Sequence, residues 1–229
     1  MAFDTGSSTW SMYFDGSDVG LRTSDVDAFY LHSDNSILLS LSTPKSVAGI
    51  GKVDDSDIIK FIPSSLGENT AGSFELFFDG SDVDLVAGEE DVDAIGFAPD
   101  GRLILSTSGP FSVSGASGQD EDLIAFTPTS LGGSTSGTWA MYFDGSDITL
   151  TSPSEDVWGT GIDSDSGDIY LTTKDGFSVS STSGDGADIF VCSPASLGSS
   201  TSCSSFDLFF DGSSNGMSRE AVDSLSIGR

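Results

Sequence analysis

Basic residues are scarce in this sequence, whose 229 residues include 8 Lys and Arg, 36 Asp and Glu, and one His. The resulting net charge of −28 repels phosphate backbones and anionic lipids, so we expect no nucleic-acid partner. No apolar run approaches the ~20 residues of a membrane-spanning helix, so we expect no membrane insertion. Two Cys residues are too few for a disulfide scaffold or a structural zinc site. Cations and neutral or basic surfaces remain as partners.

Proline is also scarce, with 7 residues, whereas there are 28 Gly and 16 Phe. Disordered chains have low hydrophobicity and few aromatic rings, and a sequence that is 37% hydrophobic and 10% aromatic does not fit that class. The Gly residues and the Ser/Thr-rich stretches indicate many turns rather than long helices. The first residues, Met1 to Asp4, lack the basic and apolar regions of a signal peptide, so the chain is either mature or a piece of a longer protein.

The chain is a tandem repeat with a period of about 65 residues. The motif Phe-Asp-Gly-Ser recurs at Phe14, Phe78, Phe143 and Phe210, and a Pro-x-Ser-Leu-Gly block precedes the last three copies. Because both motifs stay in register along the chain, we expect a single repeat domain, 1–229. Its expected parts are an outer strand within 1–21, repeats at 22–85, 86–150 and 151–217, and the first strand of a fourth repeat at 218–229.

Each repeat contains four short runs with the pattern of β-strands. In the second copy they are 92–97, 103–107, 123–126 and 139–143, separated by Gly, Asp and Pro. Small residues in the first run and aromatic rings in the last suit a radial blade with a crowded inner strand. The pattern therefore predicts an all-β, β-propeller-like array of three four-stranded repeats with one extra strand at each end. A three-fold β-trefoil or β-prism also has four strands per repeat and is the alternative.

The repeat motifs resemble those of a group of bacterial proteins. The strings Tyr-Phe-Asp-Gly-Ser-Asp-Val-Gly-Leu at 13–21 and Asp-Val-Asp-Ala at 25–28, together with Pro-Thr-Ser-Leu-Gly at 128–132, are similar to tandem repeats of uncharacterised secreted or surface-anchored bacterial proteins. The similarity covers residues 5–228. It implies an extracellular, propeller-like protein and brings no assigned activity or catalytic residue. In a secreted protein, Cys192 and Cys203 are expected to form a disulfide that closes the loop between them.

Aspartates recur at equivalent positions in the turns and at the starts of the first strands. Ca²⁺ binds six to eight oxygens, which turns rich in Asp, Ser and Gly can supply, so calcium is a candidate cofactor. The alternative is that each Asp caps its own turn, as Asp-Gly hairpins do without metal. The candidate calcium ligands are Asp18, Asp25, Asp27, Asp82, Asp91, Asp93, Asp147 and Asp156.

Two motifs suggest catalysis, and the repeat explains both without it. The sequence Asp4-Thr5-Gly6 resembles the catalytic loop of pepsin-like proteases, but it aligns with the linker before the fourth strand of a repeat. The single histidine, His32, has no marked carboxylate partner for a Ser-His-Asp triad and is expected at a strand end on the surface. The recurring aromatic column that includes Trp10 and Trp139 suits a core more than a sugar-stacking platform. We therefore expect no enzyme and no catalytic residue.

These observations predict a non-enzymatic extracellular protein for structure, adhesion or assembly. The alternative is a carbohydrate- or calcium-dependent binding propeller, with glycans as partners. The end strands, from Trp10 to Phe14 and from Val222 to Ile227, contain no Lys or Pro to blunt an unpaired edge. Strand addition would then join the ends to copies of the same chain, as a ring or filament, or to neighbouring repeats of a longer chain. The residues expected at these contacts are Trp10, Met12, Phe14, Val222, Leu225 and Ile227.

Overall fold

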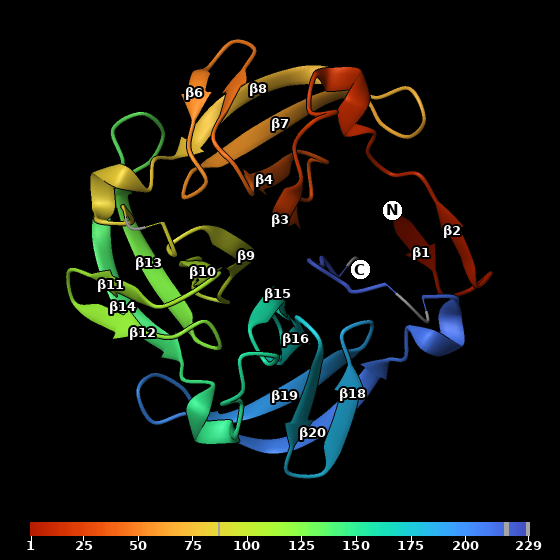
Figure 1. Ribbon diagram of the computed structural model, residues 1–229, viewed down its shortest axis with the longest axis vertical. Coiled ribbons are helices and arrows are strands. Elements are labelled where there is room, and N and C mark those ends of the chain that lie inside the picture. Colours follow the sequence, from red (N-terminus) through yellow and green to blue (C-terminus); the bar gives the residue numbers. More distant parts are fainter. Residues whose placement is uncertain (87, 218–219, 228–229) are drawn as a thin grey trace.

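The computed structural model describes residues 1–86, 88–217 and 220–227, and within these ranges the chain is all β with four short 3₁₀ turns. The all-β prediction is confirmed. The strands of the described residues form three four-stranded and four two-stranded antiparallel sheets. Figure 1 shows the four-stranded sheets side by side around a common centre.

Each four-stranded sheet runs outward from this centre in the order of the sequence. Sheet 1 consists of β3 (Val26–Leu31), β4 (Ile37–Leu41), β7 (Ile58–Ser65) and β8 (Ala71–Phe78). Sheet 2 consists of β9 (Val92–Phe97), β10 (Leu103–Thr107), β13 (Leu123–Ser130) and β14 (Ser136–Phe143). Sheet 3 consists of β15 (Val157–Ile162), β16 (Ile169–Thr173), β19 (Ile189–Ser196) and β20 (Ser202–Phe210).

A small hairpin joins the second and third strands of each sheet, where the sequence predicted only Ser/Gly-rich connections. In sheet 2, Phe111 and Val113 are buried around the exposed Ser112, and Gly115 makes the turn with a φ of 102°. The alternation of buried and exposed residues is typical of a strand, but three residues are too short a run to find by periodicity. The three hairpins are β5 (Lys45–Val47) with β6 (Gly51–Val53), β11 (Phe111–Val113) with β12 (Ala116–Gly118), and β17 (Gly176–Val179) with β18 (Thr182–Asp185).

The second strand of each sheet is the most buried one. All five residues of β4 and of β10 are buried, because these strands lie between two neighbours and under the adjoining sheets. This double burial explains the continuous apolar runs at 37–39 and 103–105, which show no alternation of polar and apolar residues.

The core lies between adjacent sheets rather than inside one of them. Phe78, at the end of sheet 1, packs edge-on against Phe126 of sheet 2, with ring centroids 5.3 Å apart. Both side chains are fully buried and belong to one apolar cluster that spans sheets 1 and 2. A second cluster spans sheets 2 and 3.

A 3₁₀ turn lies at each of the four Phe-Asp-Gly-Ser motifs. These turns are η1 (Gly16–Val19), η2 (Ser81–Val83), η3 (Ser146–Ile148) and η4 (Ser213–Asn215).

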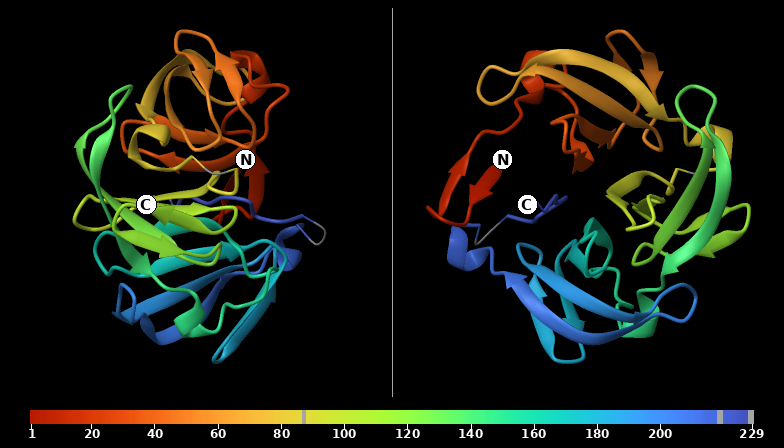
Figure 2. Two further views of the ribbon diagram at one scale, coloured as in Figure 1. Left: turned by 60° about the vertical axis from the view of Figure 1, so that its left-hand side comes forward. Right: turned by 180° about the vertical axis from the view of Figure 1, so that it is seen from behind.

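The two ends of the chain lie in the same part of the ring, between sheet 3 and sheet 1 (Figures 1 and 2). We call this part the fourth sector; it contains β1 (Ala2–Asp4), β2 (Thr9–Ser11) and the segment 220–227. The prediction of a strand from Trp10 to Phe14 is wrong beyond Ser11, because the strand found here is Thr9–Ser11. The sequence did not predict β1. The strand predicted from Val222 to Ile227 is corrected, because this described segment has no strand-ladder partner and is irregular.

Candidate functional site

Three of the candidate calcium ligands hold neighbouring sheets together. At the junction of sheets 1 and 2, Asp82 Oδ2 accepts a hydrogen bond from the Thr135 N–H at 2.9 Å. The Thr135 hydroxyl accepts from the Asp79 N–H at 2.9 Å and donates to the Gly132 carbonyl at 2.7 Å. The Gly132 N–H donates to the Phe77 carbonyl at 2.8 Å. Asp18 and Asp147 make the same bond to Thr70 and Thr201, so all three carboxylates have a structural role.

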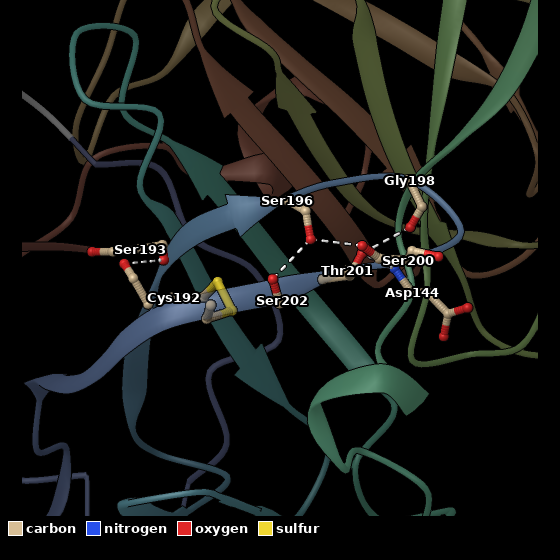
Figure 3. Close-up of a disulfide and its surroundings, with 10 residues drawn as sticks. Asp144, Cys192, Ser193, Ser196, Gly198, Ser200, Thr201 and Ser202 are labelled. Atoms are coloured by element: carbon tan, nitrogen blue, oxygen red, sulfur yellow. Dashed lines mark hydrogen bonds between the residues drawn. A yellow bond between two sulfur atoms is a disulfide. The ribbon is translucent and has the colours of Figure 1, made fainter.

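The third copy of this junction lies beside the disulfide (Figure 3). Thr201 Oγ1 accepts from the Asp144 N–H at 2.9 Å and donates to the Gly198 carbonyl at 2.8 Å. Cys192 and Cys203 form a disulfide across β19 and β20, with their Cα atoms 5.5 Å apart. The disulfide therefore links β19 and β20, the two strands whose connecting loop contains Gly198 and Thr201.

A second set of repeated aspartates links two turns within each sheet. Asp122 Oδ1 accepts from the Gly145 N–H at 2.8 Å, and its Oδ2 accepts from the Gln119 N–H at 2.9 Å. Asp57 and Asp188 make the equivalent pairs of bonds in sheets 1 and 3. These side chains connect the turn before the third strand to the turn after the fourth. Their recurrence before the third strand was visible in the sequence, but the distant N–H groups that they bind were not.

The remaining candidate ligands start the inner strands, near the centre of the ring. Asp25, Asp91 and Asp156 precede β3, β9 and β15, and Asp27 and Asp93 follow two residues later. Asp93 is 4% exposed, and neither of its carboxylate oxygens has a hydrogen-bond partner among the described residues. Buried carboxyl groups normally have such partners, so Asp93 is an exception that asks for an explanation.

Burial and mutual repulsion raise the pKa values of these carboxyl groups. Burial, with a contribution from Asp156 and then Asp27, raises the pKa of Asp93 well above its usual value. Burial and the charge of Asp120 raise the pKa of Asp156 to about 7. Burial, followed by the charges of Asp91 and Asp25, raises the pKa of Asp27 to about 6. Asp93 therefore interacts electrostatically with both Asp27 and Asp156. We call these three residues, one from the inner strand region of each sheet, the central acidic cluster.

The central acidic cluster does not form a ready-made metal site. Among the residues that the structure describes, no three His, Cys, Asp or Glu side chains are grouped so that they could hold a metal ion. Asp25 is exposed, and Asp156 Oδ2 accepts a hydrogen bond from the Trp158 indole at 3.0 Å. Binding of a cation by the expected ligands would need their side chains to move.

Asp4 and His32, from the two motifs that suggest catalysis, both make contacts that explain their positions without a catalytic role. Asp4 Oδ1 accepts from the Gly6 and Ser7 N–H groups at 2.8 and 3.2 Å, which makes it the cap of its own turn. His32 is half-buried rather than a surface residue, because its ring packs against Tyr30 and Phe97 with centroid distances of 5.1 and 5.6 Å. Burial lowers the pKa of His32.

The aromatic column differs between the complete sheets and the fourth sector. Trp139 is 7% exposed and belongs to the core between sheets 1 and 2, whereas Trp10 is 38% exposed. A shallow depression between sheets 2 and 3 is lined by carboxyl, amide, hydroxyl and proline side chains: Pro110, Gln119, Asp120, Glu121, Thr151, Ser152 and Pro153. This lining has no aromatic ring on which a sugar could stack.

The six residues expected at the ends have unequal environments. Trp10, Met12 and Ile227 are exposed, whereas Leu225 is 4% exposed. Phe14 and Val222 are half-buried. Leu225 is therefore part of the protein interior and is not available to a partner.

Comparison with protein-family models, with curated proteins and with solved structures finds no match to this chain. The resemblance to secreted bacterial repeats stays a prediction. In the described part of the chain there is no helix of the length and apolar character that a membrane crossing requires.

Proposed function

We propose that this chain is a non-enzymatic, extracellular structural and assembly module with a β-propeller-like fold. Radial sheets around one centre support a propeller over a trefoil or prism, since apolar clusters lie between neighbouring sheets of the ring. The repeated Asp and Thr side chains support a structural role, because they are engaged in bonds between and within sheets. The Cys192–Cys203 disulfide supports an oxidising, extracellular location.

The fourth sector is the observation that carries the assembly function. Sheets 1, 2 and 3 each have four paired strands, whereas the described residues of the fourth sector have one two-stranded sheet and an irregular segment. Strands without a full set of neighbours present free N–H and C=O groups that another polypeptide can pair with. Association through this sector is the role that the geometry supports best.

Sedimentation velocity of the full chain at increasing protein concentration tests this function. We expect the mass to rise above the 23.6 kDa of one chain. Each copy has a net charge of −28, so two copies repel each other, and salt screens this repulsion. Association should therefore be stronger at 500 mM than at 50 mM NaCl. A mass of one chain at every concentration and salt would contradict self-association.

A calcium-dependent binding module is the second candidate, and Asp93 favours it. A buried carboxyl group with two unpartnered oxygens beside other carboxylates can gain a partner when a cation binds. The measurement is the melting temperature with Ca²⁺, with Mg²⁺ and with chelator, for the wild type and for Asp93→Asn. A Ca²⁺-induced rise that Asp93→Asn abolishes would support this candidate, and an unchanged melting temperature would remove it.

A further inference from the structure

We propose that the central acidic cluster, Asp27, Asp93 and Asp156, binds one Ca²⁺ ion that links sheets 1, 2 and 3 at the centre of the ring. This inference rests on the calcium-dependent candidate above and names its site and ligands. The other recurring aspartates are not part of this site. Those that bond to Thr N–H groups of the next sheet already have a structural role, and they are Asp18, Asp82 and Asp147.

The inner strands of the three sheets bring the cluster together. β3, β9 and β15 surround the centre of the ring, and β9 lies against both of the others (Figure 1). Each of these strands begins with Val, and the next residue is Asp27 in β3, Asp93 in β9 and Trp158 in β15. Asp156 directly precedes β15. The three carboxyl groups therefore come from three different sheets and from the same end of their inner strands.

Main-chain hydrogen bonds hold the starts of the inner segments in one register. The N–H groups of Val92, Val157 and Val222 each donate to a carbonyl of the preceding sheet, at 3.2, 3.1 and 2.8 Å; the acceptors are Asp55, Asp120 and Gly186. The segment 220–227 thus enters the centre as β9 and β15 do, and the exposed Asp223 in it adds a carboxyl group next to the cluster.

Asp93 is the side chain that lacks a partner. It is 4% exposed, and both of its carboxylate oxygens are buried with no hydrogen-bond partner among the described residues. The charged groups with the largest effect on it are Asp156, Asp27 and then Asp120, which are all acidic. A buried carboxyl group in such surroundings must either keep a proton or receive a cation.

Asp156 can supply a second oxygen without losing its existing hydrogen bond. Its Oδ2 accepts from the Trp158 indole at 3.0 Å, whereas its buried Oδ1 has no partner among the described residues. An ion at Oδ1 leaves the indole bond in place, and the bond keeps the carboxylate oriented. The three carboxylates are not grouped closely enough to hold an ion as they stand, so Asp27 and Asp93 must rotate toward it.

The basic side chains of the protein do not neutralise this cluster. Lys174 lies over the Trp158 ring, 5.7 Å from its centroid. Burial and Asp120 raise the pKa of Asp156, and the charge of Lys174 offsets only part of this rise. The ion pairs found among the described residues involve none of the three carboxylates; they are Lys52–Asp54, Lys60–Glu75 and Arg102–Asp100. A divalent cation would offset the negative charge that remains at the centre.

Ca²⁺ suits these ligands better than Mg²⁺ or Zn²⁺. The ligands are carboxylate oxygens from three separate sheets, with water available to complete the shell. Ca²⁺ accepts six to eight oxygens in a flexible geometry, whereas Mg²⁺ requires a near-ideal octahedron. Zn²⁺ prefers Cys and His ligands, but Cys192 and Cys203 form a disulfide and His32 packs against aromatic rings.

Calorimetric titration of CaCl₂ into the chelator-treated full chain measures the site. At about 150 mM NaCl, which screens weak binding to the acidic surface, we expect one site per molecule. Asp93→Asn should weaken binding at least ~10-fold. The matched control, Asp84→Asn, removes one charge at an exposed position and should stay within ~2-fold of the wild type. Cooperative melting of both variants in chelator shows that they are folded.

Tb³⁺, a substitute for Ca²⁺ whose emission is excited by a nearby indole, locates the ion. Trp158 is on the inner strand β15, whereas Trp139 and Trp10 are on the outer strands β14 and β2. Excitation of Trp should give Tb³⁺ emission that Ca²⁺ displaces. Trp158→Phe should lose most of this emission, through the lost indole or through the lost orientation of Asp156, and the control Trp10→Phe should keep it.

Three results would overturn the inference: no Ca²⁺ site, equal binding by Asp93→Asn, or unchanged Tb³⁺ emission from Trp158→Phe. Several weak sites that salt removes would also overturn it, because Ca²⁺ would then only screen the acidic surface. A Ca²⁺-induced rise in melting temperature that Asp93→Asn retains would leave a calcium-dependent function standing and reject the central site. Self-association without a Ca²⁺ site would reject the site and leave the assembly function standing.

Discussion

Replacement of Asp156 by Asn should stabilise the protein at alkaline pH and have little effect in acid. Asp156 is 3% exposed, its Oδ1 has no hydrogen-bond partner among the described residues, and its pKa is raised to about 7 by burial and by Asp120. In the unfolded chain the pKa of Asp is about 3.9. The folded state therefore holds a proton that the unfolded state releases between these two pH values. Stability from this group is fully present below about pH 4 and is lost as the pH rises through about 7.

The size of the effect follows from the two pKa values. Ionising Asp156 in the folded protein costs up to ~4 kcal/mol at pH 8, and partial hydration of the side chain reduces this to ~2 kcal/mol. An Asn side chain avoids the charge and can still accept the bond from the Trp158 indole. Urea unfolding at pH 4 and pH 8 measures the effect. Asp156→Asn should gain ~2 kcal/mol at pH 8 and stay within ~0.5 kcal/mol of the wild type at pH 4.

The control is Asp84→Asn, at an exposed position with a φ of 75° that Asn tolerates, and it should change little at either pH. A loss of stability of Asp156→Asn at pH 8, or an equal effect at both pH values, would show that a buried, ionising Asp156 is not the cause.

Three further predictions concern the junctions, the aromatic column and the disulfide. Thr135→Ala leaves the part-buried Asp79 N–H without its acceptor, so the unfolding free energy measured in urea should fall by ~1–3 kcal/mol, whereas Thr135→Ser should stay close to the wild type. Trp139→Ala should cost ~3–5 kcal/mol and Trp10→Ala less than half of that, because Trp10 is more exposed; equal losses in thermal unfolding would contradict this. Unreduced protein should show no thiol with Ellman's reagent, and reduction of Cys192–Cys203, which are 11 residues apart, should cost ~3 kcal/mol.

The repeat made the four strands of each sheet predictable. The Phe-Asp-Gly-Ser motif marks the end of every fourth strand, and apolar runs such as 103–105 mark the second strands. The small hairpins were not predicted because Phe111-Ser112-Val113 is too short for a periodic signal. β1 was not predicted because Ala2–Asp4 is a run of only three residues. It pairs with β2 across a short turn that Asp4 caps, whereas a longer loop joins the third and fourth strands of the complete repeats.

The positions of the recurring aspartates were predictable, but their roles were not. Asp82 and Asp93 look alike in the sequence, as acidic residues at repeated positions. Asp82 accepts a hydrogen bond from the Thr135 N–H of the next sheet, 53 residues away. Asp93 is buried near the centre of the ring, and its carboxylate has no hydrogen-bond partner among the described residues. The difference depends on which sheets become neighbours, and a single repeat does not contain that information.

The proposed assembly function depends on the two ends of the chain lying together in the fourth sector of one molecule. Amide hydrogen exchange at Val222, measured by NMR in dilute protein, tests this arrangement, because this N–H makes the bond to Gly186 that Val92 and Val157 make in complete sheets. We expect Val222 to exchange at least ~100-fold more slowly than an unstructured amide, and protection to be independent of protein concentration. Exchange at the unstructured rate, or protection that grows only as the protein is concentrated, would show that the ends do not close the ring within one chain.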